Sequence, residues 1–396
     1  MKRYISFFFC FLFCFALYPG SAVRAGEDKA KGKLRQIAQF EGGTLFQNGA
    51  VKVVELKGTY RQMGRQYGFL MRNDLRDVYK LILEEYAGRQ KFSNERLKTI
   101  ADAFYNIYPM RYRELFSGIA ETSGLTPEQI RIINAVEFFP KINHLEYNCS
   151  ALAVWNDYTK DGSVVFGRNN DDAPFFKIFG SYVSIAVLKP DDGSLPTAIV
   201  NYTGAIYAAN GMNSKGVFLE LNGGPWEGFY LNRPSIFVSL MSYLQDLPSI
   251  ELINEAIMAE KANMSSIVTI ADGKRAYSVE CSCSTARIMD GGHEAIVAAA
   301  NHFADPAWGL SQLDDKKGGD TMKRRANLLA LGKKFKGQFD AAKMMEVFDT
   351  TIENGGATSP YGTIFQIVAV PGKYVMWIKA PGTFDWTEAD LSKILK

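Results

Sequence analysis

The amino-acid sequence predicts an α+β protein in which two β-sheets follow a helical N-terminal region. Residues 59–142 are dominated by helical periodicity, and at Cys149 the pattern changes to a series of short strands. Two helical stretches then precede a second series of strands. Strand runs, then helices, then strand runs again favour layered sheets over alternating βαβ units. The chain has 396 residues, 47% hydrophobic and 22% charged, so it can bury a full core.

The first 25 residues differ from the rest of the chain. Lys2 and Arg3 precede an apolar run that ends near Tyr18, and small residues lead up to Ala25. This layout is typical of a secretory signal peptide cleaved after Ala25. An uncleaved membrane anchor is the alternative, and the short apolar run argues against it. We therefore expect an exported protein, periplasmic or secreted. The net charge of +3 gives no indication of nucleic-acid binding.

The segment between residue 25 and Cys149 is expected to be mainly helical. Residues 26–40 are polar and are expected to lack regular structure, whereas residues 50–58 alternate like a strand. Apolar residues then recur at helical spacing. The helical stretches are 59–90, 94–124 with a break near Pro109, and 126–142, where Thr126 is the expected N-cap. Gly64 and Gly68 share one face of the first stretch, so another backbone can approach closely there.

Short strand-like runs follow Cys149 and are separated by turn residues. The predicted strands of the first series are 150–157, 164–170, 181–189, 197–204 and 216–223. Helices are predicted at 234–246 and 249–261, before four further strands between 266 and 301. A helix at 320–334 and a hairpin at 363–380 complete the predicted elements.

Three cysteines remain once Cys10 and Cys14 leave with the signal peptide. An odd number in an exported protein suggests a free and reactive thiol. Cys281 and Cys283 lie on one face of a strand-like run, where a strained disulfide or a metal pair are alternatives. No second Cys/His cluster supports zinc, so we favour two small core residues. Cys149 is then the candidate nucleophile.

A cysteine nucleophile needs a base, and histidine is the usual one. The chain has three histidines, and Cys149 precedes strands instead of opening a helix, so a papain-like site is weakly supported. There is another solution if the peptide bond before Cys149 is cut. The freed α-amino group has a reference pKa of about 7.7–8.0, which allows it to accept the thiol proton near neutral pH. Nucleophile and base then belong to one residue.

The stretch CSALAVWNDYTKDGSVVFGRNND, which begins at Cys149, resembles the N-terminal-nucleophile (Ntn) cysteine amidohydrolases. This superfamily includes penicillin V acylase, bile salt hydrolase, acid ceramidase and the acyl-coenzyme A:6-aminopenicillanic acid acyltransferases. The matching residues are Cys149, Asp161, Gly162, Gly167, Arg168, Asn169 and Asp171. Residues 55–75 are similar to the helix that opens the acyltransferase-type proteins, so the resemblance is strongest to that group.

The resemblance implies a four-layer αββα sandwich with an N-terminal helical pro-segment. The chain would be cut between Asn148 and Cys149, which leaves residues 26–148 as a small subunit and 149–396 as the catalytic domain. The acyltransferase prototype is cut at Gly-Cys, whereas Asn148 stands at that position here. The resemblance also implies that Arg168 lowers the thiol pKa and that Asp171 holds the new α-amine. A turn-capping role is the alternative for Asp171.

Three later motifs add to the implied site. NGMNSKGVFLELNGG resembles the hairpin that ends in an oxyanion-hole Asn, here Asn222, and AAANHFADP resembles the strand end with a second active-site Asn, here Asn301. GDTMKRRANLL resembles a helix start that supplies a late Arg, for which Arg324 fits best and Arg325 is its rival. His302, next to Asn301, is interpreted as a structural residue.

The expected reaction is attack of the Cys149 thiolate on a linear amide of a small N-acyl compound, through an acyl-enzyme that passes to water. No metal or organic cofactor is needed. Loop aromatics are expected to bind the acyl group, namely Phe175, Phe176 and Trp226. Two alternatives remain. One is an acyltransferase that moves an acyl group from a thioester or amide to an amine, and the other is a non-catalytic secreted binding protein of the same fold.

Overall fold

The computed structural model describes residues 33–139, 149–230, 232–309 and 320–396. The predicted signal peptide and Asn148, on one side of the predicted cleavage site, lie outside the described residues. Within the described ranges, no helix combines the length and the apolar character that crossing a membrane requires.

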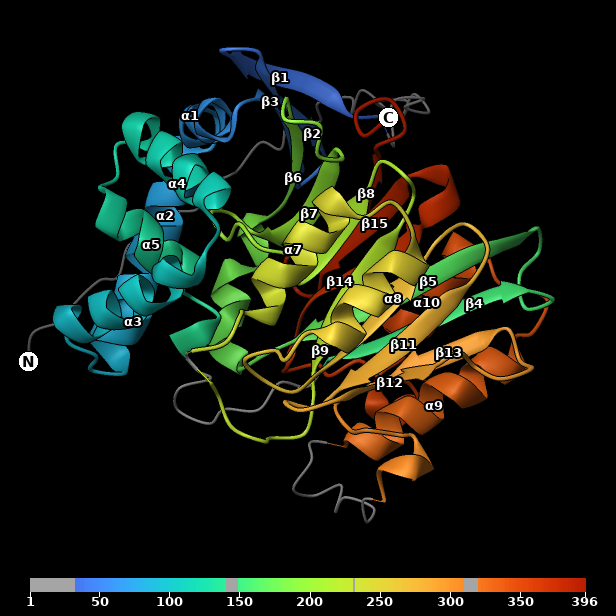
Figure 1. Cartoon of the computed structure of the whole chain (residues 1–396). Helices are drawn as coiled ribbons and strands as arrows, with labels where there is room; N and C mark the ends of the chain where they lie inside the picture. The colour runs from blue at the N-terminus through green and yellow to red at the C-terminus, as the bar shows by residue number, and fades with distance from the viewer. Residues whose placement is uncertain (1–32, 140–148, 231, 310–319) are drawn as a thin grey trace, which may run out of the picture. The chain divides into compact units, whose positions relative to one another are not determined.

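The strands form two sheets, and the predicted α+β class is confirmed (Figure 1). The ten-stranded sheet contains, in spatial order, β1 (Arg35–Phe40), β2 (Gly43–Asn48), β3 (Val51–Gly58), β6 (Val183–Pro190), β7 (Thr197–Tyr202), β8 (Asn210–Asn213), β9 (Phe218–Gly223), β10 (Ser266–Ala271), β11 (Ala276–Cys281) and β12 (Ala286–Met289). The six-stranded sheet contains β13 (Ile296–Ala299), β4 (Ser150–Asn156), β5 (Gly162–Asp171), β14 (Thr363–Val370), β15 (Val375–Ala380) and β16 (Phe384–Asp390). Neighbouring strands are antiparallel except β3 and β6.

The two sheets face each other and carry helices on their outer faces. β11 lies against β13 and β4, and the rings of Phe166 and Phe218 meet between the sheets with centroids 4.9 Å apart. Helices α7 (Ile236–Asp246) and α8 (Ile250–Ala259) pack on the ten-stranded sheet. Helices α9 (Thr321–Lys334) and α10 (Ala341–Asp349) pack on the six-stranded sheet. These elements therefore form the layer order α, β, β, α.

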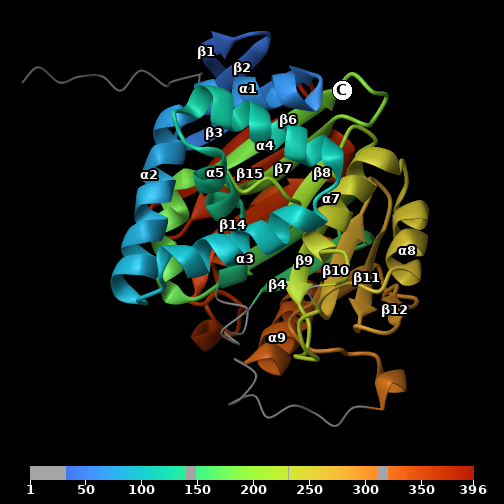
Figure 2. The same ribbon diagram turned by 60° about the vertical axis from the view of Figure 1, so that its left-hand side comes forward.

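The N-terminal helices pack closely where the sequence predicts close approach. They are α1 (Tyr60–Leu70), α2 (Arg72–Ile82), the π-helical turn η1 (Leu83–Arg89), α3 (Asn94–Ile107), α4 (Met110–Ser123) and α5 (Pro127–Asn134). Helices α1 and α4 lie side by side (Figures 1 and 2). A Cβ at Gly64 would collide with the carbonyl oxygen of Leu115, and one at Gly68 with that of Ile119. The two glycines therefore set the separation of these helices.

The beginning of the chain differs from the prediction. Residues 35–40 were expected to lack regular structure, but they form β1, and β1 to β3 extend the ten-stranded sheet beside β6. The segment before Cys149 is thus not wholly helical. β1 is an edge strand with mostly exposed side chains, so it lacks the apolar alternation by which a half-buried strand is recognised.

Candidate active site

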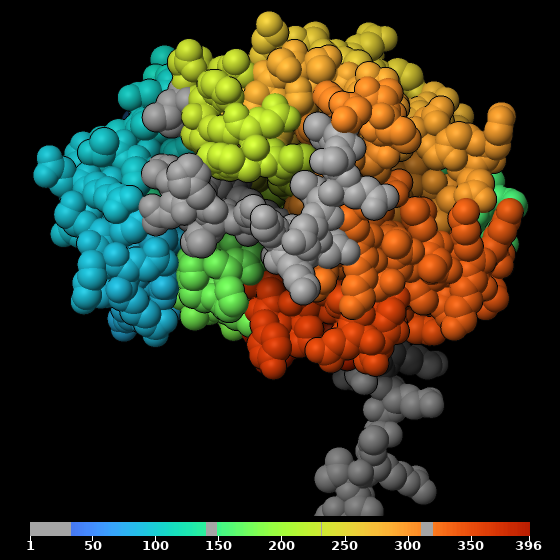
Figure 3. Space-filling model, turned by 90° about the horizontal axis from the view of Figure 1, so that it is seen from below, coloured from blue at the N-terminus to red at the C-terminus, as the bar shows by residue number. Residues whose placement is uncertain are grey.

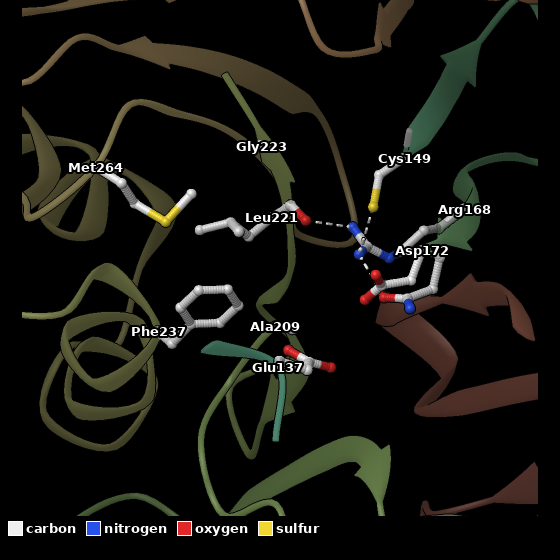
Figure 4. A pocket seen from close by; sticks show the side chains of 10 residues that line it. Glu137, Cys149, Arg168, Asp172, Ala209, Leu221, Gly223, Phe237 and Met264 are labelled. Atoms are coloured by element: carbon white, nitrogen blue, oxygen red, sulfur yellow. Dashed lines mark hydrogen bonds between the residues drawn. The ribbon is translucent and has the colours of Figure 1, made fainter. Parts of the chain in front are cut away.

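The hairpin of β4 and β5 brings Cys149 next to an arginine and an aspartate. Cys149 directly precedes β4, and Ala151 of β4 lies opposite Arg168 of β5. The Cys149 Sγ lies 3.5 Å from Arg168 Nη2, and its thiol donates to the backbone carbonyl of Asp171 at 3.6 Å. The thiol is buried between the two sheets, at one wall of a cavity (Figure 4). The predicted nucleophile, Arg168 and Asp171 are therefore neighbours.

The alternation of β5 explains why Gly167 precedes Arg168. Phe166 and Arg168 point toward the ten-stranded sheet, where they meet Phe218 and Glu220. Gly167 points to the opposite face, where a Cβ would collide with the Phe348 ring of α10. Glycine thus lets α10 pack on the strand that carries Arg168.

Arg168 is held by a buried ion pair that the sequence analysis missed. Its Nη1 donates to the Glu220 carboxylate of β9 and to the Leu221 carbonyl at 2.8 Å, and its Nη2 donates to Asn170 Oδ1 at 2.8 Å. Burial raises the pKa of Glu220, and the nearby Arg168 opposes that rise. A lone acidic residue in the otherwise apolar run GVFLEL is the signal that could have identified Glu220.

Asp171 is buried with one oxygen bound and the other near a cation. The Thr363 hydroxyl donates to Oδ1 at 2.6 Å, and Arg324 Nη1 lies 3.9 Å from Oδ2. Oδ2 receives no hydrogen bond from the described part of the chain. Burial raises the pKa of Asp171 to about 6, although Arg324 and the Thr363 hydroxyl act in the opposite direction. The carboxylate is therefore ionised at neutral pH and can hold a cation.

The structure brings Arg324 and Asn301 into the cluster. Arg324 Nη1 donates to the Cys149 carbonyl at 2.7 Å, and its Nη2 donates to Asn301 Oδ1 at 2.8 Å. Asn301 Nδ2 in turn donates to the Gly223 carbonyl at 2.9 Å. Arg325 points elsewhere, because its Nε donates to the Ala298 carbonyl at 2.9 Å. Of the two candidate arginines, Arg324 is thus the one that reaches Cys149.

Asn222 lies on the same side of β9 as Glu220. Its Oδ1 accepts from Arg168 Nη1 at 3.3 Å, and its buried Nδ2 has no hydrogen-bond acceptor among the residues that the structure describes. An unused amide donor next to Arg168 suits the stabilisation of a developing oxyanion. His302 is buried against the Thr321 hydroxyl at 2.9 Å from Nδ1, as expected for a structural residue.

Burial raises the thiol pKa of all three cysteines in the part of the chain that the structure describes. Burial raises the pKa of Cys149 to about 12, and Arg168 opposes this shift without overcoming it. Cys281 and Cys283 are free and buried, which agrees with the interpretation as core residues. Because the Cys149 thiol stays protonated at neutral pH, catalysis at this residue needs an additional base.

The cavity next to Cys149 is not lined by the predicted aromatics. Its lining residues are Glu137, Cys149, Arg168, Asn170, Asp172, Ala209, Leu221, Gly223, Phe237 and Met264. Phe176 is fully buried against Phe179 and Tyr202, and Phe175 packs on Tyr86. Trp226 is 51% exposed. Phe175 and Phe176 lie on a short 3₁₀ helix, Pro174–Tyr182, whose apolar side chains pack into the core. Their apolar character therefore reflects core packing and does not mark the cavity.

The fold and the cluster together define a layered α+β protein with a buried cysteine, arginine and aspartate between its two sheets. Among solved structures, the chain is similar to the N-acylethanolamine-hydrolyzing acid amidase ortholog of Caenorhabditis elegans, with 17% identity over 57% of this chain and 93% of that chain (TM-score 0.44). It is also similar to a mutant conjugated bile acid hydrolase from Clostridium perfringens (15% identity, 63% and 94%, TM-score 0.43). A third likeness is to penicillin V acylase from Agrobacterium tumefaciens (11%, 62% and 87%, TM-score 0.41).

No protein-family model matches the chain, and no curated protein matches it at a significant level. Identities and TM-scores as low as those of the three solved structures identify no activity for this chain.

Proposed function

We propose that the chain is an exported, self-processing N-terminal-cysteine amidohydrolase of the Ntn-hydrolase superfamily. It would cleave linear C–N amide bonds of small N-acyl compounds through an acyl-enzyme on Cys149. The observation that carries this proposal is the placement of the Cys149 thiol between Arg168 and Asp171, 3.5 Å from the Arg168 guanidinium. Around it, Asn222, Asn301 and Arg324 supply further polar groups that suit amide chemistry.

Cleavage between Asn148 and Cys149 would convert the inactive thiol into a nucleophile. The released α-amine takes the proton of the thiol, which gives an ammonium and a thiolate. The Asp171 carboxylate stabilises this ammonium, and Arg168 stabilises the thiolate, because each places an opposite charge next to the new one. No histidine is required in this scheme.

The thiolate then attacks the carbonyl carbon of the amide and forms a C–S bond. The carbonyl oxygen becomes an oxyanion, to which Asn222 Nδ2 and a backbone N–H donate hydrogen bonds. When the C–N bond breaks, the ammonium of Cys149 gives its proton to the leaving amine. Water, deprotonated by the same α-amine, hydrolyses the thioester, and the acid leaves as the thiol is restored.

The segment before Cys149 would remain bound as a small subunit after cleavage. β3 pairs with β6 from Lys52 to Gly58, and the Gly204 N–H donates to the Tyr67 hydroxyl at 2.8 Å. On the face seen in Figure 3, the blue-to-cyan surface of this segment borders the green and yellow-green surface of later residues. Loss of the segment would leave the β6 edge and much buried apolar surface exposed to water.

The proposal is tested by incubating the purified protein with N-acyl amides and measuring release of the acid and the amine. The wild type should hydrolyse the amides without a coenzyme A thioester, and Cys149→Ala should release neither product. Turnover that occurs only with acyl thioester donors would replace hydrolysis by the acyltransferase alternative. No turnover of either kind by correctly folded protein would favour a binding protein of the same fold.

A further inference from the structure

One polar side chain in the wall of the Cys149 cavity has no role in the mechanism proposed above. Asn170 of β5 lines this cavity, and only 5% of it is exposed. Its Oδ1 accepts at 2.8 Å from Arg168 Nη2, the same nitrogen that lies 3.5 Å from Cys149 Sγ. Its Nδ2 has no acceptor among the residues that the structure describes. A buried amide donor without an acceptor is unfavourable, so this group is a candidate for contact with a ligand.

Arg168 holds two asparagines by their oxygen atoms. Asn222 Oδ1 accepts from Arg168 Nη1 at 3.3 Å, and Asn170 Oδ1 accepts from Nη2 at 2.8 Å. A guanidinium has only donors, so each amide turns its oxygen to Arg168 and its nitrogen away from it. Asn222 Nδ2 is the donor that the proposed mechanism assigns to the oxyanion. Asn170 Nδ2 is thus a second amide donor, fixed by the same guanidinium and available to another oxygen of the substrate.

The charged side chains around the cavity indicate what kind of oxygen fits there. Glu137 and Asp172 line it, and Arg168, the cation among its described lining residues, is paired with Glu220. Phe237 lies away from Arg168 and Asp172 and contributes apolar surface (Figure 4). A substrate carboxylate would come next to acidic side chains, and like charges in contact disfavour binding. A neutral oxygen accepts from Asn170 without this cost.

We propose that Asn170 Nδ2 donates a hydrogen bond to a neutral oxygen of the substrate and thereby determines specificity. Resting on the proposed function, this inference makes the preferred substrates uncharged N-acyl amides that carry a second oxygen a few bonds from the scissile carbonyl. The oxygen can belong to the acyl part, as in an alkoxyacyl amide, or to the amine part, as in an N-acyl alkoxyalkylamine.

Two pairs of substrates test the inference, and in each pair one oxygen replaces one CH₂ group. N-methyl-3-methoxypropanamide and N-methylpentanamide differ on the acyl side, and N-(2-methoxyethyl)pentanamide and N-butylpentanamide differ on the amine side. An apolar site alone would favour the CH₂ member, because burial of a methylene is favourable. We expect kcat/KM of the purified protein to favour the oxygen member of one pair by at least about fivefold. A preference for the CH₂ member in both pairs, or none in either, would overturn the inference.

Variants of Asn170 separate contact with the substrate from support of Arg168. Asn170→Leu removes both the donor and the acceptor, whereas Asn170→Asp keeps an acceptor for Arg168 and lacks the amide donor. Both should lower the oxygen-to-CH₂ ratio of kcat/KM by at least about fivefold. If Asn170 only holds Arg168, kcat falls equally for both members of a pair, and the unchanged ratio overturns the inference. Asn73→Leu, at an exposed position of α2, is the control and should leave the ratio unchanged.

A charged and an uncharged substrate test the neutrality of the oxygen. N-pentanoylglycinamide and N-pentanoylglycine differ in a terminal amide and a terminal carboxylate. We expect the wild type to favour the amide by at least about tenfold in kcat/KM, because the carboxylate would meet the acidic side chains of the cavity. A preference for N-pentanoylglycine would overturn the assignment of a neutral acceptor.

Calorimetric titration separates this inference from the proposed function, because it does not depend on turnover. If the protein hydrolyses none of these compounds, they serve as ligands in place of substrates. Tighter binding of the oxygen member by the wild type but not by Asn170→Asp would then support the Asn170 contact and contradict the hydrolase. Hydrolysis with the same oxygen-to-CH₂ ratio in the wild type and in both Asn170 variants would support the hydrolase and overturn the contact. Equal binding without hydrolysis would overturn both.

Discussion

Replacing Asp171 by Asn tests the cost of keeping a negative charge in the buried site. The side chain keeps its shape, and Oδ1 can still accept from the Thr363 hydroxyl. The change is best made in Cys149→Ala, which is expected to remain a single chain without a free α-amine. In the intact chain, burial raises the pKa of Asp171 from 3.8 to about 6. Each pKa unit corresponds to about 1.4 kcal/mol, so ionisation costs the fold about 3 kcal/mol at neutral pH.

The sign of the pH dependence follows from this shift. The folded chain holds the Asp171 proton more tightly than the unfolded chain does, because the pKa is higher in the folded state. The stability that the protonated carboxyl contributes is therefore complete below about pH 4 and is lost as the pH rises through about 6. We therefore expect Asp171→Asn to match its parent at about pH 4. At about pH 7.5 it should have an unfolding free energy higher by about 3 kcal/mol.

Urea unfolding followed by tryptophan fluorescence at both pH values measures the difference. Asp157→Asn is the matched control, because this aspartate is exposed in the same hairpin, directly after β4, and its replacement should change the stability little. An Asp171→Asn protein that is less stable than its parent at pH 7.5, or a stability difference independent of pH, would show that ionised Asp171 does not destabilise the folded chain.

Three further predictions concern the site and its scaffold. Arg168→Lys keeps the charge but loses the planar guanidinium that contacts Glu220, Leu221 and Cys149, so turnover should fall by about 10²-fold. A kcat close to that of the wild type would show that Arg168 has no part in the reaction. Glu220→Gln leaves the buried Arg168 guanidinium without its counter-charge, so the free energy of unfolding measured in urea should fall by about 3–5 kcal/mol. An unchanged urea midpoint would contradict a stabilising ion pair. Gly64→Ala places a methyl group against α4 and should cost about 1–3 kcal/mol, while Gly88→Ala, where the space is ordinary, should not.

The sequence predicted the local part of the site well because that part is one hairpin. The alternation of β4 and β5, joined by Asp161-Gly162, is enough to bring Arg168 and Asp171 back to Cys149. The glycine spacing in α1 likewise predicted the close approach of another backbone, and the structure shows that this backbone is that of α4. Such features depend on residues that are close in the sequence, or on a repeat that is visible within a few helical turns.

Other features depend on packing between distant elements and were not predicted. Glu220 meets Arg168 only because β9 of one sheet faces β5 of the other, and Thr363 reaches Asp171 from β14. Phe176 was expected at the cavity, but its environment is set by Phe179 and Tyr202, which bury it in the core. Strand β1 is stabilised by pairing with β2 and not by a buried apolar face, so its composition contained no strand signal.

Mass spectrometry of the purified protein shows directly whether Cys149 becomes an N-terminal nucleophile. Because 396 residues weigh 44.1 kDa, the chain should separate into fragments of about 14 and about 28 kDa, the larger beginning with Cys149. Acid quenching during turnover of an N-acyl amide should add the mass of the acyl group to the peptide that begins with Cys149. A fully active single chain, or an acyl group found on another residue, would contradict the account.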